Sequence, residues 1–175
     1  MTTIYEPDEV GVLGGTKIKV CAAIVDPAAP KLATEVNALT SHDVSLTFLQ
    51  WNPTVTENTG TSPKAVGQKR QYPRPGQAQY APIEVRYRCD PQADDDDPNN
   101  KAKAMLTEGT KQDVLVRKGP DAEDVPFAIG DRTETWRVLC GRQSVVPSGD
   151  DDFAVWVVVQ MLYPIREEGH GVIVA

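Results

Sequence analysis

The residues that most often bind transition metals are few and scattered in this 175-residue chain. Cys21, Cys89 and Cys140 show no C-x-x-C spacing, and a zinc site would need a nitrogen ligand from His42 or His170. The cysteines are therefore predicted to be buried, small apolar residues of a protein in a reducing cytoplasm. No metal or cofactor is expected.

Other chemistry-bearing patterns are also weak. The glycine-rich Gly11–Gly15 lacks the lysine of a phosphate-binding loop and is predicted to be a flexible arm at 1–15. The acidic runs Asp94–Asp97 and Asp150–Asp152 could bind calcium, but they lack the alternating oxygens and central glycine of an EF-hand. A solvated loop and a polar turn are the simpler interpretations. Neither histidine lies in a nucleophile motif, so the chain is predicted not to be an enzyme.

Composition limits the class of protein further. A length of 175 residues predicts a single domain spanning 1–175. The net charge of −7 argues against a general nucleic-acid binder, which needs a basic face. No secretory segment is recognised at the start, and no apolar run is long enough to span a membrane.

Alternation of apolar and polar residues predicts a chain made mostly of strands. In Pro82–Cys89 the apolar side chains share one face and the charged ones the other. Phe153–Tyr163 is apolar on both faces, which predicts burial on both sides. Trp136 and Trp156 are expected in the core. The remaining predicted strands are Thr16–Ile24, Val44–Leu49, Val114–Arg117 and Thr133–Val145.

Two short helices are predicted between the strands. Leu32, Val36 and Leu39 have helical spacing, which favours one short helix or turn after Pro30. Asp97 is suited to cap a second helix that runs to about Thr107. The predicted fold class is mostly β, a β-sandwich or barrel with one flanking α-helix and a long inter-strand loop.

That loop, residues 52–81, is the most informative segment of the chain. It is rich in proline, shows no apolar periodicity, and is predicted to lack regular secondary structure. It has no acid between Glu57 and Glu84, although the chain as a whole is acidic. A basic arm on an acidic body favours self-assembly, with a plain solvated loop as the alternative. The residues predicted to make this contact between copies are Trp51, Lys64, Lys69, Arg70, Tyr72 and Arg74.

The chain end, residues 164–175, is interpreted as a second arm. Val172, Ile173 and Val174 form a short apolar run that would be an edge-pairing hazard if it stayed exposed. It is predicted to be received by another subunit or to fold back as an edge strand.

The strand Lys17–Val20 leads into Ile24–Asn37, which contains Asp26-Pro27, Pro30, Leu32 and a Glu-Val-Asn ending. This stretch resembles the N-terminal region of major tail tube proteins from siphophages of actinobacteria, although it lacks the glycine that usually follows Asn37. The order of the later elements is similar to that family over most of the chain.

The resemblance implies a structural virion protein in the phage tail, assembled in the host cytoplasm. Six copies would form a ring, and rings would stack through a long loop and the chain termini into a tube that conducts double-stranded DNA. The implied partners are further copies of the chain, the tape measure protein, and the tail terminator and distal tail proteins. An acidic lumen that repels phosphates would give the net charge a function.

Two other classes of protein fit the same residues. One is a tail terminator, connector or minor tail protein of similar fold. The other is a stand-alone β-sandwich binding module or enzyme.

Overall fold

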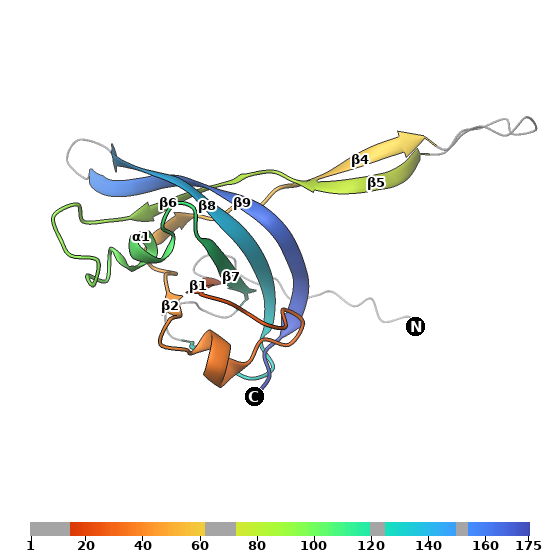
Figure 1. Ribbon diagram of the computed structural model, residues 1–175, viewed down its shortest axis with the longest axis horizontal. Coiled ribbons are helices and arrows are strands. Elements are labelled where there is room, and N and C mark those ends of the chain that lie inside the picture. Colours follow the sequence, from red (N-terminus) through yellow and green to blue (C-terminus); the bar gives the residue numbers. More distant parts are fainter. Residues whose placement is uncertain (1–14, 62–72, 120–124, 150–153) are drawn as a thin grey trace, which may run out of the picture.

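The computed structural model describes residues 15–61, 73–119, 125–149 and 154–175, of which 55–61, 73–79 and 166–169 are described by their backbone alone. An antiparallel sheet curls into a half-barrel and forms the body of the protein (Figure 1). The prediction of a mostly β chain with a barrel-like sheet is confirmed.

Seven of the described strands form this sheet, in the order β2-β1-β7-β8-β9-β6-β3. The two longest strands, β8 and β9, lie next to each other near the middle of the sheet and are paired from Arg132↔Val172 to Ser148↔Val155. Three register shifts interrupt this pairing, and such bulges bend and twist a ladder. In chain order the seven strands are β1 (Thr16–Cys21), β2 (His42–Asp43), β3 (Phe48–Gln50), β6 (Ile83–Arg88), β7 (Lys111–Lys118), β8 (Arg132–Ser148) and β9 (Val155–Val172).

The main core lies on one face of the sheet. Ile83, Val85 and Tyr87 of β6 are buried there, as the alternation in the sequence predicted. Helix α1 (Lys101–Met105) covers this face, and Leu106 at its end is fully buried in the same core. The prediction of a helix packed against the sheet is therefore confirmed.

A second, smaller core lies on the opposite face of β1 and β7. It forms around Cys21 and Leu115, and a single π-helical turn, η1 (Leu32–Val36), covers it. Phe127 and Ile173 complete it from distant parts of the chain. Because β7 lies between the two cores, its central residues are buried on both faces.

The helix predicted to start at Asp97 is shorter than expected, and Asp97 is not its cap. The Asp97 carboxylate accepts a hydrogen bond from the backbone N–H of Asn99 (2.8 Å). This bond forms a local turn, which competes with helical hydrogen bonding at the same residues. Asn100 is fully buried and donates from its amide to three loop carbonyls, those of Asp90, Ala93 and Asp94. The helix therefore begins only at Lys101.

The predicted strand Val44–Leu49 is also wrong as a continuous element. The Asp43 carboxylate accepts from the backbone N–H of Ser45 (3.0 Å), and Phe48 N–H donates to the carbonyl of Val44 (3.0 Å). These bonds make a turn between β2 and β3. Leu39 is likewise 98% exposed, because η1 has already ended at Val36.

Only part of β9 is buried on both faces. Val157 and Val158 are fully buried, whereas Trp156 is 51% exposed, so its predicted place in the core is wrong. The pairing of β6 with β9 ends at Arg88↔Val157, and Trp156 lies just beyond it. Trp136 is 3% exposed, which confirms its predicted burial.

Candidate functional site

The segment predicted as an assembly arm contains a β-hairpin that projects from the body (Figure 1). Its strands are β4 (Val55–Thr61) and β5 (Pro73–Tyr80), paired antiparallel. The prediction that this segment lacks regular secondary structure is therefore wrong. Pro73 and Pro75 are two residues apart, so their nitrogens face the same edge of the ribbon, and a free edge tolerates a missing donor.

The predicted contact residues of this arm fall in different places. Arg74 lies in β5, opposite Gly60 of β4. Trp51 lies just before the hairpin, at the body. Lys64, Lys69, Arg70 and Tyr72 lie outside the described residues. Contact of these residues with another ring stays a prediction.

Aromatic side chains anchor the base of the hairpin to the core. The Trp51 and Trp136 rings pack with their centroids 6.5 Å apart. The Tyr80 ring packs edge-on against the Trp136 ring, with a centroid distance of 5.8 Å. The Phe48 ring also packs against Trp51, with the ring centroids 6.4 Å apart. Ala81 N–H also donates to the carbonyl of Thr54 (3.2 Å), which joins the two strands where they leave the body. The hairpin therefore has a fixed attachment to the sheet.

The strand edges of the sheet that lack a neighbour in the described parts of the chain include the end of β8 and the outer side of β3. Strand β7 pairs with β8 only as far as Lys111↔Leu139, so Gln143–Ser148 is paired on one side alone, by β9. Strand β3 ends the sheet order and pairs only with β6 among the described strands. Such edges offer backbone donors and acceptors to another chain.

The end of the β8–β9 ladder exposes apolar side chains on both of its faces. Val145 and Trp156 share one face, and Val146 and Val155 share the other. Together they form what we call the ladder tip. This surface was not predicted from the sequence, because Trp156 was expected in the core. Further along the two strands Leu139, Tyr163 and Ile165 are also exposed.

The apolar chain end folds back onto its own chain. Ile173 is 1% exposed and belongs to the second core, while Val172 and Val174 are partly exposed. Val174 exchanges backbone hydrogen bonds with the chain at the start of η1: its N–H donates to the carbonyl of Pro30, and its carbonyl accepts from the N–H of Leu32 (both 2.9 Å). A contact of Val172 and Val174 with another subunit stays a prediction.

A buried arginine fixes the loop that precedes β8. Arg117 donates to the carbonyl of Val125 (2.7 Å) and to the Asp131 carboxylate (2.8 Å), and it lies over the ring of Phe127. Burial by itself would raise the pKa of Asp131, but the bonds from Arg117 and from the N–H of Ala128 outweigh it and lower the pKa. In the sequence, the position of Arg117 directly after the apolar Val114–Val116 indicated a buried charge that needs partners.

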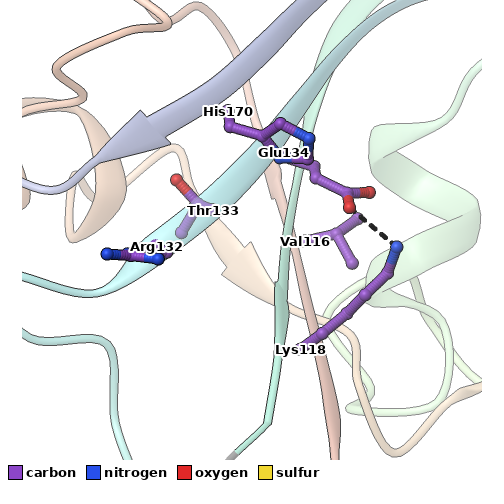
Figure 2. A pocket seen from close by; sticks show the side chains of 6 residues that line it. All are labelled: Val116, Lys118, Arg132, Thr133, Glu134 and His170. Carbon is purple, nitrogen blue, oxygen red and sulfur yellow. Dashed lines mark hydrogen bonds and ion pairs between the residues drawn. The ribbon is translucent and has the colours of Figure 1, made fainter.

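A polar cleft of about 130 Å³ opens between β7, β8 and β9 (Figure 2). Its central contact is the ion pair of Lys118 with Glu134, at 2.7 Å, which joins two neighbouring strands. The cleft is lined by Val116, Lys118, Arg132, Thr133, Glu134 and His170. Because the lysine and the glutamate neutralise each other, this arrangement is suited to holding strands together.

Metal-binding residues stay apart in the described parts of the chain. No group of three or more His, Cys, Asp or Glu among those residues could hold a metal ion. Cys21, Cys89 and Cys140 are free and buried, as predicted. The Asp94–Asp96 side of the acidic loop is exposed to solvent, and Asp150–Asp152 and the arm 1–14 lie outside the described residues. None of the described helices is long and apolar enough to cross a membrane.

Comparison with known proteins agrees with an assembly function. Residues 6–162 match the phage tail tube protein family. The cryo-EM structure of the anti-feeding prophage baseplate, 6-fold symmetrised, is similar in fold, with a TM-score of 0.51, 10% identity and 95% of each chain covered. No curated protein matches the chain. Since the family match spans most of its length, this chain belongs to the phage tail tube protein family.

Proposed function

We propose that copies of this chain join into rings, and that the rings stack into a phage tail tube through which DNA passes. The observation that carries the proposal is the family match over residues 6–162. The described surface supports it, because it combines open strand edges with a projecting hairpin, two features by which copies can meet.

Within a ring, the copies join through their strand edges. Backbone pairing across an open edge supplies hydrogen bonds without requiring particular side chains. The open stretch Gln143–Ser148 of β8 and the edge strand β3 are the described candidates for such pairing. Contacts between different edges of identical copies close into rings or continue as filaments.

Between rings, the 52–81 hairpin makes the main contact. Its sequence carries Lys64, Lys69, Arg70 and Arg74, whereas the whole chain has a net charge of −7. The exposed Asp94–Asp96 is one acidic surface that such charges could meet. Complementary charges give orientation and register to an encounter.

Finer features of the assembly follow from the same proposal. We propose a siphophage tail, six copies in each ring, assembly around a tape measure protein, and contact with the tail terminator and distal tail proteins. The six-fold symmetry in the description of the baseplate structure is in keeping with this number. The tube would conduct DNA during ejection, and an acidic lumen would keep phosphates from adhering. The chain would act without catalysing a reaction.

Electron microscopy of the purified protein tests this function. Rings or tubes of uniform diameter are expected, together with sedimentation that depends on protein concentration. A protein that remains monomeric at every concentration and ionic strength would contradict the proposal.

A second candidate function is that of a less abundant tail component, such as a terminator, connector or baseplate protein. The fold similarity to a baseplate structure is the observation that favours this candidate. Copy number in the virion separates the two functions, because a tube protein is a dominant band of purified particles and a connector is scarce.

A further inference from the structure

We infer that Trp156 of one copy inserts into an aromatic cleft between β1 and β3 of a second copy. This inference rests on the proposed function, since it names a contact by which copies of the chain assemble.

Trp156 has the properties of an interface anchor. It is 51% exposed although it lies in a strand whose next two residues are fully buried. The ladder tip adds three further exposed valines around it: Val145, Val146 and Val155. Tryptophan is enriched among the few residues that carry most of the binding energy at interfaces. An apolar tip of this kind, repeated on every copy of a dense assembly, needs a partner surface.

The cleft combines apolar and polar side chains. It has a volume of about 200 Å³ and is lined by Ile18, Phe48, Leu49 and Trp51 together with the polar Thr16, Ser45 and Gln50. A cavity of about 150 Å³ lined by apolar side chains accepts benzene. The cleft therefore has room for much of an indole ring. Phe48 and Trp51 supply ring faces and edges for it to pack against.

Trp156 cannot fill the cleft of its own chain. Strand β6 lies between β9 and β3 in the sheet order, and the cleft opens on the far side of β3, toward β1. The occupant must therefore come from a second copy. Because the tip and the cleft are different surfaces, the contact is heterologous, and one copy can use both at once with two different neighbours.

Open backbone edges accompany both surfaces. The ladder tip adjoins the unpaired edge of Gln143–Ser148, and the cleft is lined by the edge strand β3. A docked neighbour could therefore add hydrogen bonds to the apolar contact.

Site-specific cross-linking tests the contact directly. Protein carrying Val145→Cys, on the same face of the ladder tip as Trp156, is mixed with protein carrying Leu49→Cys and oxidised. Heterodimers are expected because Trp156 is kept and Leu49 lines the cleft and is partly exposed. The natural cysteines are buried and give a low background. Leu39→Cys, at a fully exposed position, replaces Leu49→Cys as the matched control and should give no heterodimer.

Assembly measurements give a second readout. Trp156→Ala and Leu49→Asp should each raise the protein concentration needed for assembly at least about tenfold, with Leu39→Ala unchanged. Circular dichroism checks that each variant stays folded. Normal assembly of Trp156→Ala with no cross-link would overturn this inference while leaving the proposed function intact. A cross-link between the two cysteine variants, together with a wild-type protein that never forms rings or tubes, would support the contact and contradict the tube function.

Discussion

Arg137 on β8 donates two hydrogen bonds of 2.8 Å to the carboxylate of Asp113, its direct neighbour on β7. Asp113 is 1% exposed. The same carboxylate accepts from the backbone N–H of Ile24 (2.6 Å), and Arg137 also donates to the carbonyl of Ile24 (3.2 Å). One ion pair thus ties the segment after β1 to the sheet, and this segment helps to close the second core.

Replacing Arg137 with Met should destabilise the subunit, because it leaves a buried carboxylate without its charged partner. The free energy of unfolding is expected to fall by about 2–4 kcal/mol in urea denaturation. Arg142→Met, at an exposed position of the same strand, is the matched control and should change it by less than about 0.5 kcal/mol. Equal effects of the two substitutions would show that the pair does not hold the fold.

Asp131 gives the stability a defined dependence on pH. Its pKa is lower in the folded protein than in the unfolded chain, so its contribution is fully present above the ordinary aspartate pKa of about 4 and is lost as the pH falls through the folded value. The difference in unfolding free energy between wild type and Asp131→Asn should therefore be largest near neutral pH and shrink toward pH 3. A difference that stays constant over this range would contradict the assignment.

Ile173 should be important for the stability of a single subunit. Ile173→Ala removes a fully buried side chain from the second core, and the expected loss is about 2–4 kcal/mol. Val172→Ala, at the exposed neighbouring position, should cost less than about 0.5 kcal/mol. Denaturation of dilute, monomeric protein measures both. If the two variants were equally stable as monomers, the chain end would matter only in the assembly.

Neutralising the basic residues of the 52–81 hairpin should weaken the stacking of rings. A protein with Lys64, Lys69, Arg70 and Arg74 replaced by Gln is expected to remain folded but to form tubes poorly, because it lacks the charges that face an acidic neighbour. Added salt should weaken wild-type stacking in the same direction. Electron microscopy and sedimentation provide the measurement.

The control for that variant changes four exposed basic residues elsewhere to Gln, namely Lys31, Lys111, Arg132 and Arg142. This control variant changes the net charge by the same amount as the hairpin variant, and its rings should stack normally. Equal loss in both proteins would assign the effect to overall charge, and normal tubes from the hairpin variant would exclude an electrostatic contact there.

Local patterns in the sequence were sufficient for the class of fold and for the best of its strands. In β6 the alternation of apolar and charged residues matches their burial, because successive side chains of a strand point to opposite faces. The unusual composition of residues 52–81 set this segment apart, and its described strands project from the body as a hairpin (Figure 1). The sequence of Ile24–Asn37 pointed to the family that the comparison supports.

Tertiary contacts decided the rest. Asn100 shortened the predicted helix by bonding to loop carbonyls, and Ile173 joined a core that includes Cys21, Ile24 and Val36, each more than 100 residues away in sequence. Trp156 carries the same apolar pattern as the buried Val158, yet it is 51% exposed because it lies beyond the part of this face that the main core covers. Periodicity specifies which face a side chain occupies, but the tertiary arrangement alone determines whether another element covers that face.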